Sequence, residues 1–202
     1  MLTYKAYSAK AHLGTPPKKP KNHKKVRSWV CTLFIPLLLV ITLNTFFIKL
    51  VFVDGNSMYP TLHSNDLVVV WQMLYTPVPS DVVLINSTAL PFFNGNIVKR
   101  IIAGEGQTVL IDYDKNIVSV DNHIMNEPYL NYEQIDPLQC NNGNAFELYE
   151  VPPGCVFVLG DNRNFSIDSR DSRVGMIQHE DVKGRLLLII PLSRILTVSG
   201  IS

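Results

Sequence analysis

A long apolar segment, WVCTLFIPLLLVITLNTFFIKLVFV, runs from Trp29 to Val53 with one basic residue, Lys49, and no acidic residue. A helix of that length rises about 37 Å, whereas the hydrocarbon core of a bilayer is about 30 Å thick. Pro36 is expected to kink this helix rather than end it, because transmembrane helices tolerate proline. The sequence therefore predicts one N-terminal transmembrane helix over residues 28–53.

Charge is divided unevenly on the two sides of this segment. Residues 1–27 hold eight of the chain's 18 Lys and Arg residues and no acidic residue, and the remainder carries 10 basic and 17 acidic residues. Basic flanks stay in the cytoplasm, so we expect a cytoplasmic N-terminus and an extracytoplasmic domain over residues 54–202 in a cell membrane. Residues 1–27 are too rich in Lys and Pro to bury a core and should form a disordered tail. Beside an apolar span, this tail suits the lipid bilayer better than nucleic acid.

Beyond the apolar segment, short runs of Val, Ile and Leu alternate with turn signals. This spacing is typical of a mainly β domain with an antiparallel sheet. Asp121-Asn122 predicts a hairpin turn, residues 126–149 are expected to form a long loop or small excursion, and residues 186–190 predict a buried strand too short to span a bilayer. The expected strands are residues 67–71, 81–86, 97–102, 108–112, 117–120, 156–159 and 185–190.

The chain has three cysteines, and none has metal-site spacing with His, so no metal is expected. Cys31 lies in the apolar segment, while Cys140 and Cys155 lie in the predicted outer domain. In an oxidising compartment these two can pair, and otherwise they remain two thiols. The sequence leaves both alternatives open.

Ser57 and Lys99 are the candidate catalytic residues. Ser57 lies four residues beyond the apolar segment, so it would act on substrates presented at a membrane face. A serine hydroxyl needs a neighbouring base, and strand alternation places Lys99 with Ile97 and Ile101, where burial lowers the pKa of an ammonium. A shift from about 10.4 to about 7.5 requires about 4 kcal/mol, which a buried lysine can attain. Taken alone, a strand lysine is more often a solvated edge charge, and a Gly-x-Ser turn is often only a turn.

Three segments in order resemble the motif boxes of the bacterial type I signal peptidases, which are peptidases of family S26. They are residues 57–62 (SMYPTL), 98–102 (VKRII) and 160–170 (GDNRNFSIDSR). The similarity runs from about residue 29 to 196. It implies a membrane-bound serine endopeptidase that removes signal peptides from preproteins without a metal or an organic cofactor, and substrates with small residues at positions −1 and −3.

The resemblance also assigns roles to residues. It implies that Ser57 is the nucleophile and Lys99 the general base, that Ser166 orients the lysine amine by a hydrogen bond, and that Asp168 and Arg170 form a supporting ion pair. A hydroxyl partner can fix the lone pair of a neutral amine toward the nucleophile. An extended substrate is expected to add as a strand along a wall formed by Val53, Met58, Leu62, Ile97 and Val98. For Met58 and Leu62, ordinary core packing is the alternative.

The chain departs from the family pattern at three places. Asn164-Phe165 stands where the family usually has Asp-Asn, residues 103–107 differ from the usual Gly-Leu-Pro-Gly-Asp, and Gly55 lies where some members carry an oxyanion-hole serine. The Ser57 N–H is then the expected oxyanion donor.

Other functions compete with general signal-peptide processing. One alternative is a Ser-Lys protease with a dedicated client, such as a pilus component, and another is an inactive membrane-anchored peptide-binding module. A self-cleaving repressor is excluded, because residues 1–27 cannot hold a DNA-binding domain.

Overall fold

The computed structural model describes residues 23–86, 93, 95–130, 138 and 144–192, without the side chains of residues 23–30 and 43–46. The chain divides into two compact units, residues 1–40 and 41–202. Most of the predicted basic tail, residues 1–22, lies outside the described residues, and so does Cys140. Cys155 is buried as a free thiol.

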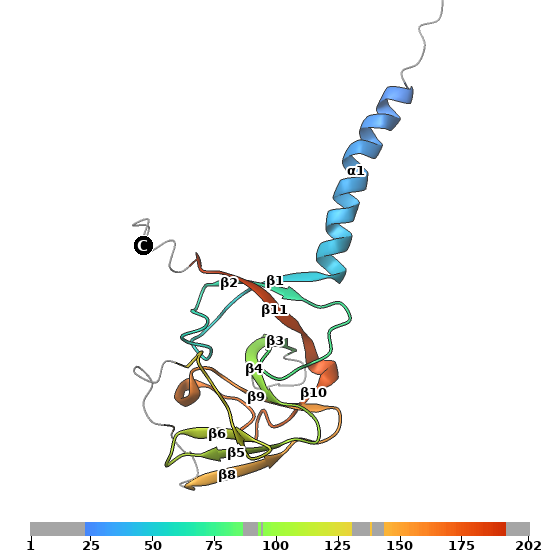
Figure 1. Ribbon diagram of the computed structural model, residues 1–202. Coiled ribbons are helices and arrows are strands. Elements are labelled where there is room, and N and C mark those ends of the chain that lie inside the picture. The colour runs from blue at the N-terminus through green and yellow to red at the C-terminus, as the bar shows by residue number, and fades with distance from the viewer. Residues whose placement is uncertain (1–22, 87–92, 94, 131–137, 139–143, 193–202) are drawn as a thin grey trace, which may run out of the picture. The chain divides into compact units, whose positions relative to one another are not determined.

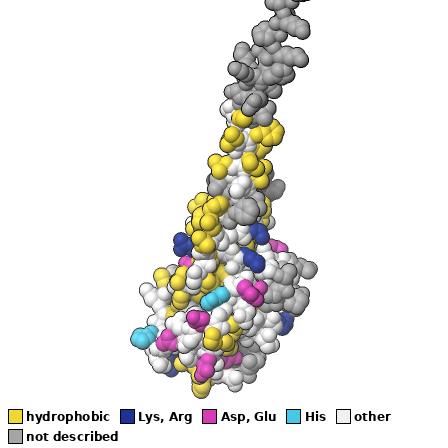
Figure 2. All heavy atoms as spheres, turned by 90° about the vertical axis from the view of Figure 1, so that its right-hand side faces the viewer, with side chains coloured by type: hydrophobic (Ala, Val, Ile, Leu, Met, Phe, Trp, Pro, Cys, Tyr) yellow, Lys and Arg dark blue, Asp and Glu magenta, His cyan; other side chains and the backbone are white. Residues whose placement is uncertain are grey.

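The helix α1 (His23–Phe46) contains Pro36. Figure 2 shows hydrophobic side chains along its described part, and the large apolar residues between Leu33 and Ile41 are exposed. Within the residues that the structure describes, no helix is both long and apolar enough to cross a membrane.

The predicted helix over residues 28–53 extends too far at its C-terminal end. Ile48–Phe52 form the strand β1, which pairs antiparallel with β2 (Leu67–Trp71) from Ile48↔Trp71 to Phe52↔Leu67. β1 satisfies the backbone groups of these residues by inter-strand hydrogen bonds, and its alternating pattern buries Val51 more than Leu50 and Phe52. The apolar run therefore supplies a helix and then the first strand of the β domain.

The β domain is built of antiparallel strands, as the sequence predicted, and these strands form two sheets. The larger is ordered β1-β2-β11-β3-β4-β9-β10 and the smaller β7-β6-β5-β8. Figure 1 shows β5, β6 and β8 at one end of the domain and β1, β2 and β11 at the other. The remaining strands are β3 (Val82–Ile85), β4 (Ile97–Ala103), β5 (Thr108–Asp112), β6 (Ile117–Val120), β7 (His123–Ile124), β8 (Phe146–Glu150), β9 (Cys155–Leu159), β10 (Ile177–Gln178) and β11 (Val182–Ile190).

The hairpin prediction is confirmed, because β6 and β7 pair across Asp121 and Asn122, whose φ angles are 51° and 65°. Two other predictions need correction. The end of the expected loop over residues 126–149 belongs to β8, which pairs with β5. β11 is a strand, but Leu187 and Leu188 are both exposed rather than buried, because the register shift between Leu186 and Leu188 interrupts the alternation of its two faces.

β4 connects the cores of the domain. Its residue Ile102 packs in an apolar cluster with Val109 and Ile111 of β5. Ile101 packs in a second cluster with strands β3 and β9, and Val98 packs in a third with Val53. Adjacent residues of β4 thus point into different clusters, which agrees with the predicted alternation around Lys99.

Gly184 of β11 leaves no room for a side chain. A Cβ atom at this position would lie 2.0 Å from the Trp71 carbonyl oxygen, and its φ of 155° is rarely adopted by other residues. We expect Gly184→Ala to lower the free energy of unfolding by about 3 kcal/mol, because overpacking forces the backbone to shift. Urea unfolding measures the change, and Gly104→Ala is the control, since a Cβ there meets only the Gln107 side chain at 3.9 Å. Equal stability of the two variants would contradict the expectation.

Candidate active site

Ser57 lies in a tight turn directly after β1. Gly55 has a φ of 86°, a conformation that suits glycine and lets the chain reverse. The turn is closed by backbone hydrogen bonds from the Tyr59 N–H to the Asn56 carbonyl and from the Leu62 N–H to the Met58 carbonyl. Met58 and Leu62 are buried, so they anchor the turn while Ser57 remains partly exposed.

Lys99 of β4 meets Ser57 across 42 sequence positions. The Nζ atom of Lys99 donates a hydrogen bond to Ser57 Oγ over 2.8 Å. The lysine is 3% exposed, and no histidine among the described residues is hydrogen-bonded to the Ser57 hydroxyl. The residues predicted as nucleophile and base are therefore in direct contact.

The environment of Lys99 suits a base that works near neutral pH. Burial lowers the pKa of its amine from 10.5 to about 8, and the positive charge of Arg170 acts in the same direction. The carboxylates of Asp168 and Asp161 oppose the shift. A neutral amine is thus accessible at mildly alkaline pH, and the pKa is lowered in the direction predicted for a lysine buried beside Ile97 and Ile101.

The hydrogen bond expected between Ser166 and Lys99 is not formed. Ser166 Oγ is buried and has no hydrogen-bond partner in the described part of the chain. Instead, Ser166 lies over Gly160, where an added Cβ would be 2.1 Å from Ser166 Oγ and 2.5 Å from the Ser57 carbonyl oxygen. The hydroxyl occupies space above the Gly160 backbone and does not reach the amine.

Asp168 and Arg170 form the ion pair that the resemblance implied. The guanidinium of Arg170 donates from Nε to one carboxylate oxygen of Asp168 over 2.8 Å and from Nη2 to the other over 2.9 Å. The same carboxylate accepts a hydrogen bond from the Gly160 N–H over 3.0 Å. The ion pair therefore fixes the backbone of Gly160, which lies next to the Ser166 side chain.

A second set of buried ion pairs supports the loop over residues 160–170, hereafter the catalytic loop, and the sequence did not predict the partners in these pairs. The carboxylate of Asp161 accepts two hydrogen bonds from Arg100, of 2.8 and 2.6 Å. Arg163 pairs with Glu127, and Tyr129 stacks on the Arg100 guanidinium at 3.7 Å. The one available signal was the position of Arg100 beside Lys99 on the opposite face of β4.

A cleft of about 300 Å³ contains Ser57 and Lys99. Four of the five residues predicted to bind substrate line it, namely Val53, Met58, Ile97 and Val98. Leu62 does not line it but is fully buried in the apolar cluster with Val53, so core packing holds for this residue. Phe52, Phe93, Phe165 and Ile167 also line the cleft and were not predicted.

Known proteins resemble the chain over most of its length. A family model described as signal peptidase, peptidase S26, matches residues 26–190. The signal peptidase I of Bacillus caldolyticus is 32% identical over 176 residues, which cover 82% of this chain and 91% of that protein. The signal peptidase I P of Bacillus subtilis subsp. natto is 30% identical over 184 residues, covering 88% and 96%.

Among solved structures, a signal peptidase I from Enterococcus faecalis V583 is 26% identical with a TM-score of 0.45, covering 56% of this chain and 98% of that one. The family model and the relative from Bacillus caldolyticus each match well over half of the sequence. The chain therefore belongs to the S26 family of signal peptidases.

Proposed function

We propose that the chain removes signal peptides from preproteins with Ser57 as nucleophile and Lys99 as general base. Membership of the family makes it a serine endopeptidase of the signal peptidase I type. The observation that supports the two roles best is the 2.8 Å contact between Ser57 Oγ and the nearly inaccessible Lys99 Nζ. The two relatives reported above are named signal peptidase I and signal peptidase I P, and neither name refers to a dedicated client such as a pilus component.

The reaction proceeds through an acyl-enzyme. Ser57 Oγ attacks the scissile carbonyl carbon while its proton passes to the neutral Lys99 amine. The Ser57 N–H, which makes no hydrogen bond within the described residues, donates to the developing oxyanion. Lys99 then returns the proton to the amine of the departing mature protein, and water deprotonated by Lys99 hydrolyses the ester.

Substrate binding uses two strand edges. β1 is the edge of the larger sheet. Among the described residues, β4 has no strand partner on its β9 side before Arg100, because its pairing with β9 begins at Arg100↔Leu159. An extended peptide between these edges gains backbone hydrogen bonds by β-augmentation. The substrate's small residues at −1 and −3 then face Val53, Met58 and Val98.

The apolar part of α1 anchors the enzyme in the lipid bilayer, with residues 1–27 in the cytoplasm and the β domain outside. The proposal rests on the large exposed side chains between Leu33 and Ile41 and on the basic residues that precede them. Protease protection in inverted vesicles tests it. We expect the β domain to be protected, and its digestion in sealed vesicles would contradict the topology.

Cleavage of a purified preprotein by the full-length protein in detergent tests the activity. Sequencing of the product should give one new N-terminus, directly after a segment with small residues at −1 and −3. Absence of any cut, or cuts scattered along the preprotein, would contradict signal peptidase activity.

The pH dependence of cleavage follows from the lowered pKa of Lys99. Because the base must be neutral, kcat/KM should rise with pH to a plateau, with a midpoint near the value of about 8. Below the midpoint we expect about a tenfold loss for each pH unit. Initial rates between pH 6 and 10 measure the profile, and a flat profile over this range would contradict the role of Lys99.

Asp168 provides a matched variant for this profile. Its carboxylate raises the pKa of Lys99, so Asp168→Asn should move the midpoint to lower pH while it also reduces the plateau rate. Asp171, a half-buried carboxylate paired with Arg173, is not among the groups that shift the pKa of Lys99. Asp171→Asn should therefore leave the midpoint in place.

A further inference from the structure

The cleft has two faces that are lined by different side chains of β1 and β4. Val51, Val53 and Val98 point into one apolar cluster together with Met58. The neighbouring residues on the same strands, Phe52 and Ile97, point to the opposite face, because side chains alternate along a strand. A peptide strand bound between β1 and β4 must therefore present successive side chains to two different surfaces.

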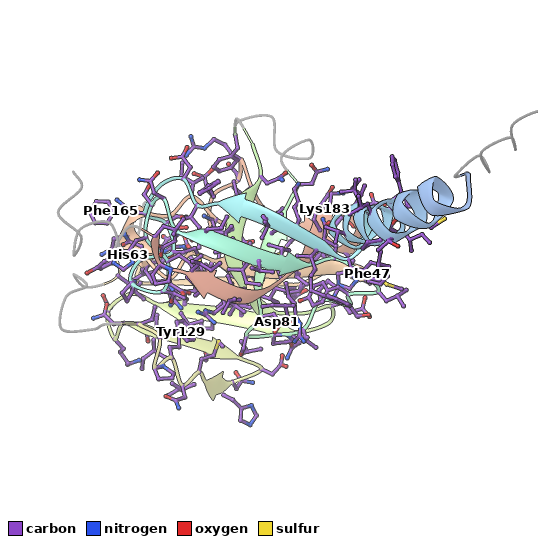
Figure 3. The ribbon with its side chains drawn as sticks, turned by 90° about the horizontal axis from the view of Figure 1, so that it is seen from above. Phe47, His63, Asp81, Tyr129, Phe165 and Lys183 are labelled. Atoms are coloured by element: carbon purple, nitrogen blue, oxygen red, sulfur yellow. The ribbon has the colours of Figure 1, made fainter. Side chains whose placement is uncertain are left out.

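Phe165 belongs to the second face. It lines the cleft together with Phe52, Ile97 and Ile167 and is 74% exposed, while Phe52 is 66% exposed. Figure 3 shows Phe165 and His63 at one end of the β domain and Phe47 and Lys183 at the other. The described residues leave both aromatic rings largely uncovered beside the reactive serine.

The position of Phe165 is fixed by the catalytic loop. Phe165 is the last residue of the short 3-10 helix Arg163–Phe165, and its N–H donates a hydrogen bond to the Asn162 carbonyl over 3.1 Å. Arg170, held by Asp168, donates to the Arg163 carbonyl over 2.5 Å. Phe165 and Ile167 also border a second hollow of about 220 Å³ that is lined mainly by polar residues, so they form an apolar ridge between this hollow and the cleft.

Within this ridge Ile167 packs against the apolar cluster of Ile101, whereas Phe165 belongs to no apolar cluster of the described residues. An exposed aromatic side chain on a rigid backbone offers a large apolar surface at little entropic cost, which makes it an effective contact for a ligand. Which substrate side chain reaches Phe165 depends on the alternation of side chains along the bound peptide strand. If the side chains at −1 and −3 face Val53 and Val98, the side chain at −2 faces Phe52, Ile97 and Phe165.

We infer that Phe165, together with Phe52 and Ile97, forms a subsite for the substrate side chain at position −2, and that this subsite selects a large apolar or aromatic side chain. The inference rests on the proposed signal peptidase function. It makes Phe165, which stands where the family usually has Asn, a specificity-determining residue of this chain.

Peptide substrates test the subsite. A series with Ala at −1 and −3 and with Phe, Leu, Ser or Asp at −2 is cleaved by the full-length protein in detergent. The wild-type kcat/KM should be at least about tenfold higher for Phe than for Ser at −2. Phe165→Asn should bring this ratio close to one, chiefly through KM for the Phe peptide, while Phe165→Leu should keep part of the preference.

Phe146→Asn is the matched control, because Phe146 is 67% exposed on β8 and does not line the cleft. It should leave the ratio unchanged. An unchanged ratio in Phe165→Asn, or equal cleavage of all four peptides by the wild-type protein, would overturn the subsite but not the proposed function. Failure of the wild-type protein to cleave any of the peptides would overturn the proposed function itself.

Discussion

Ser57→Ala and Lys99→Ala should each reduce preprotein cleavage by at least about 10⁴-fold, because each variant removes one half of the pair that forms the ester. The double variant should be no slower than either single variant, since residues that act as a unit are not additive. Single-turnover assays with excess enzyme measure the residual rates.

Lys115→Ala is the control for the lysine variant, because Lys115 is an exposed lysine paired with Asp112. It should cleave at the wild-type rate, and urea unfolding should show that the inactive variants remain folded. Cleavage by Lys99→Ala within tenfold of the wild-type rate would contradict the dyad. Such a result would also indicate that a group other than Lys99 acts as the base for Ser57.

Gly160→Ala should reduce cleavage by at least about 100-fold, because a methyl group there cannot coexist with two neighbours of the active site. It would lie 2.1 Å from Ser166 Oγ and 2.5 Å from the Ser57 carbonyl oxygen. The Ser57 carbonyl also accepts a hydrogen bond from the Asn162 N–H over 3.0 Å, so a displaced Gly160 moves the nucleophile's own backbone. A shift of about 1 Å can cost about 100-fold in rate.

Gly104→Ala serves as the control for this variant as well, since a Cβ at Gly104 is in ordinary contact only. The kinetic prediction is a fall in kcat with little change in KM, because the cleft walls at Val53 and Val98 are untouched. If Gly160→Ala kept the wild-type kcat, the account of Gly160 and Ser166 would be wrong. Pairing it with Ser166→Gly adds a second check, since removal of both Oγ and Cβ of Ser166, 2.1 and 2.4 Å from the added methyl group, should partly relieve the collision.

The sequence predicted the β domain well because its strands are short, rich in β-branched residues and separated by turn signals. The strand over Leu67–Trp71 has the predicted bounds, and so does the strand over Thr108–Asp112. β1 was missed for a physical reason. Ile48–Phe52 continue the apolar run of the preceding helix, so hydrophobicity does not mark the boundary, and only the backbone pairing with β2 identifies it.

The candidate site was predictable in part. Strand alternation predicted a buried Lys99, but its contact with Ser57 joins residues 42 positions apart, and the resemblance to known motif boxes supplied the pairing. The ion pair between Glu127 and Arg163 has no periodic signal, because it links the segment after β7 to the catalytic loop. The exposure of Phe165 depends on what packs around the loop, which no local pattern encodes.

Acylation by a β-lactam inhibitor tests the central claim most directly, because it traps the nucleophile that the base has activated. The full-length protein is incubated with the inhibitor, digested, and mapped by mass spectrometry. The account predicts a single adduct on Ser57 in the wild-type protein, forming faster as the pH rises toward the plateau, and no adduct on this residue in Lys99→Ala. An adduct on a different residue, or equal labelling of Ser57 in Lys99→Ala, would contradict it.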